Sequence, residues 1–240
     1  WDEGGSLDGA YGPYEQDARR GLYEEALQQL LQQGLIYPCY CTRAELAASA
    51  PHGEDGERIY PGTCSAGVAE NKLARRPSLR LKVPAEEFVF EDGLCVVVRH
   101  NLHQECRDLV VRRSDGVHAY QLAVVVDDAL MGITHVLRGA DLLSSTPRQL
   151  YLYRLLGYQA PAFSHVPLLV DEKGVRLSKR HGALAVAALR ERGVRAERVI
   201  GLLAWLAGLL PSLEEAQPQE LIGLFALQKI PRQDIIVSET

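Results

Sequence analysis

Hydrophobic and polar positions along the chain follow two different periods, and each period predicts a different kind of element. Between Pro13 and Leu35 the apolar residues recur every three or four positions, and Gly34 stands near the end of this stretch. That spacing places the apolar side chains on one face of a helix, and proline and glycine suit the first turn and the end of a helix. We therefore predict an amphipathic helix over residues 13–35 that packs one face on a core.

Short apolar runs separated by turns follow and predict a strand-rich middle region. Two of the turns contain Asp92-Gly93 and Asp115-Gly116, which are typical of hairpins. The predicted strands cover residues 78–83, 88–90, 94–98 and 109–112.

A continuous apolar run over residues 121–126 predicts a strand buried on both faces of a parallel sheet. Residues 133–137 are a second candidate for a buried strand, and residues 165–170 are predicted to form a third strand. A helix is expected after the second of these segments, because Ser145-Thr146-Pro147 places a hydroxyl cap before a proline in the first turn. After Gly182 the chain is expected to be helical, with breaks near Gly193, Pro211 and Pro231. Strands that alternate with helices predict an α/β fold.

Composition and charge narrow the class of protein. The chain has 240 residues, of which 47% are hydrophobic, enough for one large core or two modest ones. A formal net charge of -5 excludes a protein that holds nucleic acid through a uniformly basic surface.

The longest apolar stretch, Val199 to Leu210, is too short to span a bilayer, so we predict a buried helix and no membrane anchor. Five cysteines, an odd number at low density, predict a cytoplasmic protein.

A basic loop follows the last predicted strand. Residues 175–182 combine Arg176, Lys179 and Arg180 with the hydroxyl of Ser178, where a strand gives way to a helix. Cationic side chains beside the amides of a helix start form an anion site. From the residues alone, this segment is either a phosphate-binding loop or a solvated basic turn.

Three cysteines gather in one part of the chain. Cys39 and Cys41 are followed by Cys64 after a polar stretch punctuated by proline and glycine. Their thiolates can reach one metal ion if the intervening loop folds back, and such soft ligands suit zinc. His52 and Tyr60 are the candidates for a fourth ligand. On spacing alone, a zinc site and three reduced, partly buried thiols are equally good interpretations.

Further candidates lie near the predicted parallel strands. Tyr120 begins one of these strands and Arg138 ends the next, so both could meet in the ligand crevice of an open α/β sheet. A carboxylate would pair with Arg138 through charge-assisted hydrogen bonds, although a core tyrosine and a surface arginine are the simpler interpretation. Asp127 and Asp128 are interpreted as a helix cap and a solvated charge rather than as a metal site.

Several of these segments together resemble the glutamyl branch of the class I aminoacyl-tRNA synthetases. The string Arg-Leu-Ser-Lys-Arg at residues 176–180 is similar to the signature loop often written Lys-Met-Ser-Lys-Ser. The stretch 119–149 looks like the glutamyl-Q tRNA(Asp) synthetases, truncated paralogues of the glutamyl enzymes. The resemblance implies an α/β, Rossmann-like class I catalytic domain with a small zinc-binding insertion and a C-terminal helical region.

The resemblance also implies a role for each candidate residue. Tyr120 and Arg138 would bind glutamate, and Lys179 would contact the ATP phosphates and stabilise the transition state of adenylate formation. The ATP site, which takes the nucleotide with Mg, would comprise Lys179, Arg176 and Ser178. The family motifs Cys-x-Cys and Tyr-x-x-x-Cys would place a structural zinc ion on Cys39, Cys41, Tyr60 and Cys64.

The activity implied is the ATP-dependent activation of L-glutamate and its transfer to queuosine in the anticodon loop of tRNA(Asp). One alternative is a fragment of a glutamyl-tRNA synthetase that charges the tRNA 3′ end. Another is a non-catalytic, zinc-stabilised RNA-binding paralogue. We expect a monomer that has no membrane partner.

The resemblance divides the chain into four parts. Residues 1–37 would be the helical part of the nucleotide-binding domain. They lack the N-terminal strand and the ATP signature of the family. Because the chain starts at Trp1, we expect the native protein to be longer. Residues 38–106 would be a connecting insertion with the zinc loop, and residues 107–182 the second half of the nucleotide-binding domain. Residues 183–240 would be a C-terminal helical region. Its small size favours the queuosine-modifying branch over the glutamyl-tRNA synthetase that charges the tRNA 3′ end.

Overall fold

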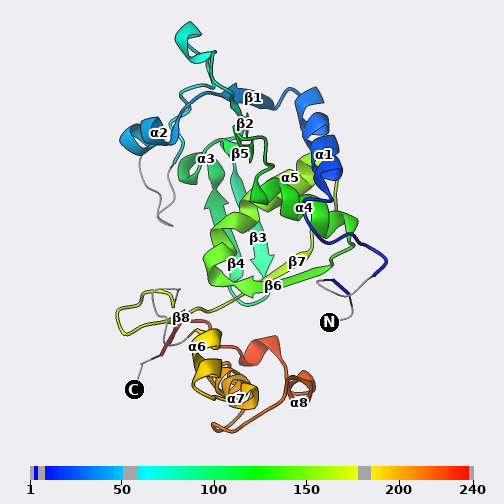
Figure 1. The fold of residues 1–240 in the computed structure, drawn as a ribbon, viewed down its shortest axis with the longest axis vertical. Coiled ribbons are helices and arrows are strands. Elements are labelled where there is room, and N and C mark those ends of the chain that lie inside the picture. The colour runs from blue at the N-terminus through cyan, green and yellow to red at the C-terminus, as the bar shows by residue number, and fades with distance from the viewer. Residues whose placement is uncertain (1–2, 5–8, 51–58, 178–184, 238–240) are drawn as a thin grey trace. The chain divides into compact units, whose positions relative to one another are not determined.

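The computed structural model describes residues 3–4, 9–50, 59–177 and 185–237 and divides into two compact units (Figure 1). The first unit comprises Trp1–Phe90, Val97–Val136 and Ser144–Ala162. The second comprises Glu91–Val96, Leu137–Leu143 and Phe163–Thr240. The four-part division expected from the family resemblance stays a prediction.

Helix α1 (Arg20–Gln32) lies in the first unit and is shorter than the predicted helix over residues 13–35. Two hydrogen-bonded turns precede it, in which the amides of Ala18 and Arg19 donate to carbonyl groups three residues back. The apolar period therefore extends over these turns as well as over the helix. The predicted inner face is confirmed, because the buried side chains recur at helical spacing: Tyr23, Ala26, Leu27 and Leu30.

Residues 121–126 belong to helix α4 (Tyr120–Leu130), so the strand predicted there is wrong. The helix packs on α1 and on α5 (Thr146–Leu156), which buries four of its apolar side chains: Leu122, Ala123, Val125 and Val126. A short, wholly apolar run has no period, so it fits a helix buried on several sides as well as a buried strand.

Helix α5 begins where Ser-Thr-Pro predicts a start, but the predicted hydroxyl cap is wrong. Ser145 makes no capping hydrogen bond, and its hydroxyl accepts one at 3.0 Å from the side-chain amide of Gln121. Pro147 occupies the first turn as expected. The helix ends at Gly157, whose φ of 71° is the left-handed conformation that glycine adopts most readily.

A three-stranded antiparallel sheet in the first unit has the order β1-β2-β5. Its strands are β1 (Ile36–Cys39), β2 (Ser78–Leu81) and β5 (Leu109–Arg112), the last two close to their predicted positions. Ile36 lies opposite Leu81, and Cys39 opposite Ser78. Helix α2 (Arg43–Ser49) follows β1 and begins with a capping box between Thr42 and Glu45.

A four-stranded sheet has the order β4-β3-β7-β6. Its strands are β3 (Glu87–Asp92), β4 (Val96–Asn101), β6 (His135–Gly139) and β7 (Ala162–Val166). Strands β3 and β7 run parallel, with Asp92 opposite Phe163. The strand predicted over residues 165–170 divides into β7 and β8 (Leu169–Val170) at Pro167, which has no amide hydrogen to donate.

The remaining elements are short, apart from α7. They are η1 (Glu70–Lys72), α3 (Leu102–Glu105), η2 (Ala140–Ser145), α6 (Val186–Glu191), α7 (Ala196–Leu206), α8 (Pro218–Ile222), η4 (Leu227–Lys229) and β9 (Ile235–Ile236). Strand β9, which the sequence did not predict, runs parallel to β8. Helix α7 is less buried than predicted, because only Gly201 and Ala204 are fully covered. Within the described part of the chain, no helix combines the length and hydropathy needed to cross a membrane.

Candidate functional site

The three clustered cysteines and Tyr60 lie together in the first unit. The sulfur atoms of Cys39, Cys41 and Cys64 are all within 4.8 Å of one another, and no disulfide joins them. The Tyr60 hydroxyl lies 3.5 Å from Cys39 Sγ and accepts a hydrogen bond of 2.8 Å from the Cys64 amide. Gly62, at a φ of 79°, turns the chain between Tyr60 and Cys64. The structure thus brings together all four residues predicted to bind zinc.

This donor set fits a tetrahedral zinc ion. Zinc–sulfur bonds of about 2.3 Å place two sulfur ligands about 3.8 Å apart at the tetrahedral angle. The distance between Cys41 Sγ and Cys64 Sγ is 3.6 Å. The other candidate ligand, His52, lies outside the described residues. Cys39, Cys41, Tyr60 and Cys64 could therefore hold the metal ion without a fifth residue.

The environment of Cys39 favours its thiolate form. Burial alone would raise the pKa of the thiol, but hydrogen bonds from Tyr60, the Cys41 backbone and Arg80 lower it to about 7. Burial and the neighbouring Cys64 raise the pKa of Cys41 to about 12. A bound cation is therefore needed for the thiols of Cys39 and Cys41 to be ionised together at neutral pH.

Arg80 is a residue of this site that the sequence analysis missed. It lies on β2 with only 7% of its surface exposed, and its guanidinium carbon is 3.7 Å from the centre of the Tyr60 ring. Its Nη1 donates to the backbone oxygen of Asp108 at 2.7 Å, and among the described residues its Nε has no hydrogen-bond partner. The available signal was a cation between the apolar residues Leu79 and Leu81 of a predicted strand.

Of the two predicted glutamate ligands, only Arg138 lies on the kind of element that was expected. Tyr120 is the first residue of helix α4 rather than of a strand, and it is half exposed. Arg138 lies on β6, as predicted, and is half-buried. Tyr120 belongs to the first unit and Arg138 to the second.

Arg138 is hydrogen-bonded to a buried histidine that the sequence analysis did not single out. Its Nε donates to Nε2 of His165 at 3.0 Å, and its Nη2 donates to the Leu142 carbonyl at 3.4 Å. Nδ1 of His165 lies 2.6 Å from a carboxylate oxygen of Asp92, and both of these side chains are fully buried. The guanidinium of Arg138 also lies 5.0 Å from the centre of the Phe163 ring.

Asp92 is held in place by the backbone around it. One of its oxygens accepts hydrogen bonds of 2.9 Å from the amides of Leu94 and Cys95. Burial opposes ionisation of Asp92, but these amides and His165 hold its pKa below the ordinary value. Burial, together with the charge of Arg138, lowers the pKa of His165 despite the opposing effect of Asp92. The geometry is therefore that of a carboxylate beside a neutral imidazole.

The basic loop is described only at its beginning. Asp171 organises a turn through hydrogen bonds from the amides of Lys173 and Val175, and Arg176 pairs with a carboxylate oxygen of Asp141. The predicted ATP ligands Ser178 and Lys179 lie outside the described residues.

Asp127 has a structural role, and the prediction that it caps a helix is wrong. It lies inside α4, where its carboxylate accepts hydrogen bonds from Arg19 Nε at 2.6 Å and from the Tyr23 hydroxyl at 2.7 Å. The neighbouring Asp128 lies 3.5 Å from the Tyr153 hydroxyl. These contacts tie α4 to α1 and α5.

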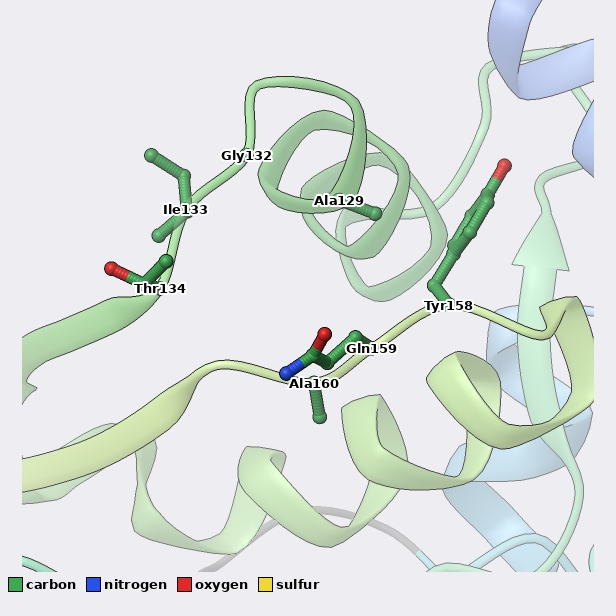
Figure 2. Close-up of a pocket in the computed structure, with 7 residues that line it drawn as sticks. All are labelled: Ala129, Gly132, Ile133, Thr134, Tyr158, Gln159 and Ala160. Carbon is green, nitrogen blue, oxygen red and sulfur yellow. The ribbon is translucent and has the colours of Figure 1, made fainter.

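A separate pocket of about 250 Å³ lies in the first unit. Figure 2 shows the segment around Gly132 and Thr134 on one side and the segment from Tyr158 to Ala160 on the other. None of the predicted site residues lines it, so it does not form part of the sites above.

Comparison with known proteins identifies the class to which this fold and these motifs belong. A family model described as "tRNA synthetases class I (E and Q), catalytic domain" matches residues 1–223. The solved glutamate-tRNA synthetase from Elizabethkingia anophelis is similar in structure, with a TM-score of 0.80 and 25% identity over 99% of this chain and 55% of that one. The chain is thus an enzyme of the ligase type with a class I tRNA synthetase catalytic domain.

Curated relatives place the chain within this class. The glutamyl-Q tRNA(Asp) synthetase from Symbiobacterium thermophilum is 51% identical over 100% of this chain and 77% of its own length. The enzyme of the same name from Nitratidesulfovibrio vulgaris is 48% identical over 98% of this chain and 75% of its own length. The chain belongs to the glutamyl-Q tRNA(Asp) synthetase family, as its motifs indicated.

Proposed function

We propose that the protein activates L-glutamate with ATP and transfers it to queuosine in tRNA(Asp). The observation that carries this proposal is a difference in sequence identity. Five relatives named glutamyl-Q tRNA(Asp) synthetase are 44–51% identical to the chain. Three relatives named glutamate–tRNA ligase are 37–41% identical.

In the proposed first step, a carboxylate oxygen of glutamate attacks the α-phosphorus of ATP. The bond to pyrophosphate breaks, and glutamyl adenylate forms. Arg138 pairs with a carboxylate group of glutamate, and Tyr120 is the second residue that we propose as a glutamate ligand. Lys179, with Arg176 and Ser178, offsets the charge that spreads over the phosphates. Magnesium enters as part of the ATP complex and neutralises phosphate charge.

In the second step, a hydroxyl of the queuosine cyclopentene ring attacks the carbonyl carbon of the adenylate. The new ester bond forms as the bond to AMP breaks, and the hydroxyl loses its proton. No covalent bond to the protein is needed, so the protein contributes by positioning the reactants and stabilising charge.

We further propose that Cys39, Cys41, Tyr60 and Cys64 hold a structural zinc ion. The support is the close approach of the three sulfur atoms and the Tyr60 hydroxyl. With all four positions filled by protein ligands, the ion has no open position for water or substrate. Its role is to tie the polar segment between Cys41 and Cys64 to the end of β1.

A fragment of a glutamyl-tRNA synthetase is the second candidate. Its support is the glutamate–tRNA ligase from Sulfurihydrogenibium sp., which is 37% identical over 100% of this chain and 52% of its own length. The other alternative, a non-catalytic RNA-binding protein, is wrong, because the matching family model is that of a catalytic domain and the named relatives are synthetases and ligases.

Glutamate-dependent exchange between ATP and pyrophosphate separates these candidates. The assay uses the complete protein that contains this chain, with and without tRNA. Exchange without tRNA supports the proposed function, and exchange that strictly requires tRNA supports the glutamyl-tRNA synthetase. Absence of exchange under both conditions would contradict both catalytic candidates.

A further inference from the structure

A chain of three hydrogen-bonded side chains in the second unit ends at the proposed glutamate ligand. Arg138 Nε is 3.0 Å from His165 Nε2, and His165 Nδ1 is 2.6 Å from Asp92 Oδ2. Asp92 comes from β3, Arg138 from β6 and His165 from β7. Neither the motifs nor the proposed mechanism gives Asp92 or His165 a role in binding glutamate.

The partners of His165 determine its protonation state. An arginine Nε can only donate, so the facing Nε2 of His165 accepts and carries no proton. An ionised carboxylate can only accept, so the single proton of the ring is on Nδ1, which donates to Asp92. Asp92 is fixed in turn by the backbone amides of Leu94, Cys95 and His165. The imidazole is therefore neutral, with one defined tautomer and orientation.

We propose that His165, oriented by Asp92, is a positioning residue that fixes the guanidinium of Arg138 for binding of a glutamate carboxylate. This inference rests on the proposed role of Arg138. Because Nε donates to His165, the planar guanidinium is constrained about its long axis, and the substrate carboxylate is bound through Nη atoms. The Phe163 ring is stacked on the His165 ring at 17° and lies under Arg138, which limits rotation of both groups.

The choice of a histidine at this position has a physical reason. A carboxylate in direct contact with Arg138 would form an ion pair and compete with the substrate for the same cation. A neutral imidazole accepts the Nε hydrogen bond without placing a negative charge directly beside the guanidinium. The imidazole ring of His165 separates Asp92 from Arg138. Asp92 therefore orients His165 without contacting the guanidinium through this hydrogen bond.

Two substitutions separate the two hydrogen bonds of His165. The amide nitrogen of Asn in His165→Asn can occupy the place of Nδ1 and donate to Asp92, but the shorter side chain offers no acceptor to Arg138. The amide oxygen of Gln in His165→Gln can occupy the place of Nε2 and accept from Arg138. Only the glutamine variant is therefore expected to preserve glutamate binding.

The test measures KM for glutamate, KM for ATP and the thermal midpoint in the complete protein, using ATP–pyrophosphate exchange. His165→Asn is expected to raise KM for glutamate on the order of tenfold, the usual effect of a lost hydrogen bond to a charged group. KM for ATP should stay within about twofold of wild type, a margin well below that effect. His165→Gln should restore KM for glutamate to within about threefold of wild type, because the bond to Arg138 is kept.

Controls distinguish the proposal from the function on which it rests. Arg138→Lys should raise KM for glutamate more than His165→Asn does, and no change in that variant would overturn the proposed role of Arg138 itself. If Arg138→Lys raises KM and His165→Asn leaves it unchanged, the positioning role of His165 is wrong. Equal increases in both KM values for His165→Asn would also overturn it, because they indicate general damage.

A second variant covers the case in which His165→Asn does not fold. Asp92→Asn keeps the shape of the carboxylate but can donate to Nδ1, which places the ring proton on Nε2, facing Arg138. The variant is expected to raise KM for glutamate selectively. An unchanged KM in a folded Asp92→Asn protein would contradict the proposal.

Discussion

The guanidinium carbon of Arg80 lies 3.7 Å from the centre of the Tyr60 ring, within the cluster of candidate zinc ligands. Three thiolates and a phenolate around a divalent zinc ion carry a net charge of about -2. A buried cation beside them offsets part of that charge and stabilises the loaded site. Partners of this kind, outside the ligands themselves, tune metal affinity in other proteins.

Arg80→Met is therefore expected to weaken zinc binding about tenfold, the lower end of the effect seen when such outer partners are lost. The side chain keeps a similar apolar length, so packing on Tyr60 is largely retained. Competition with a chromophoric chelator measures the affinity directly. The matched control is Arg75→Met, which removes an exposed arginine paired with Glu45 and should leave the affinity unchanged. Equal affinities in wild type and Arg80→Met would contradict this role.

Tyr60→Phe removes the phenol oxygen and keeps the aromatic ring under Arg80. If the hydroxyl is the fourth ligand, zinc affinity falls and the chelator lowers the thermal midpoint at a lower concentration than in wild type. Substitution of cobalt for zinc gives an absorption spectrum that reports whether the coordination changes. Tyr40→Phe, between Cys39 and Cys41, is the control. Wild-type affinity in Tyr60→Phe would exclude the hydroxyl as a ligand.

Asp127→Ala tests whether the carboxylate in helix α4 is structural. The substitution leaves Arg19, which is 4% exposed, without its carboxylate partner, and breaking such a buried pair costs about 3–5 kcal/mol. Urea unfolding should show a loss of this size. Asp17→Ala, which breaks an exposed pair with Arg20, should cost less than about 1 kcal/mol. Comparable small losses in both variants would contradict a structural role for Asp127.

The pKa of His165 predicts a pH dependence of stability. Burial and Arg138 hold this pKa below the ordinary value near 6.5, although Asp92 and Asp141 act in the opposite direction. A histidine with a lowered pKa in the folded state stabilises the fold above the unfolded-state pKa. This contribution is lost as the pH falls below that value and through the folded-state pKa. The free energy of unfolding of wild type should therefore decrease below about pH 6.5 more steeply than that of His165→Asn.

Unfolding curves at several pH values between neutral and mildly acidic conditions test this prediction. Asp92 also has a lowered pKa, but its contribution is lost only near and below the ordinary carboxyl range, so the two effects separate. Parallel pH profiles for wild type and His165→Asn would show that His165 does not titrate as described.

Local signals predicted several elements correctly, and they also predicted one cluster of side chains. The Ser-Thr-Pro sequence located the start of α5, and short apolar runs located β2 and β5. The Cys and Tyr spacing predicted side chains that the structure brings together. Each of these signals depends on neighbouring residues or on a motif, so it is visible in the sequence itself.

The remaining features depend on contacts between distant segments. Residues 121–126 form a helix because α1 and α5 cover them, which a run without a period could not indicate. His165 and Asp92 are 73 positions apart in sequence, so their pairing depends on the parallel alignment of β3 and β7. Arg80 is likewise recognisable as part of the cysteine site only after the sheet places it beside Tyr60.

The transfer of labelled glutamate to tRNA tests the central claim most directly. The substrates are tRNA(Asp) with queuosine, the same tRNA without queuosine, and queuosine-containing tRNA(Asp) that lacks its 3′-terminal adenosine. We expect label on both queuosine-containing tRNAs, whether or not the terminal adenosine is present, and none on the tRNA without queuosine. Transfer that requires the terminal adenosine and is independent of queuosine would contradict the proposed function.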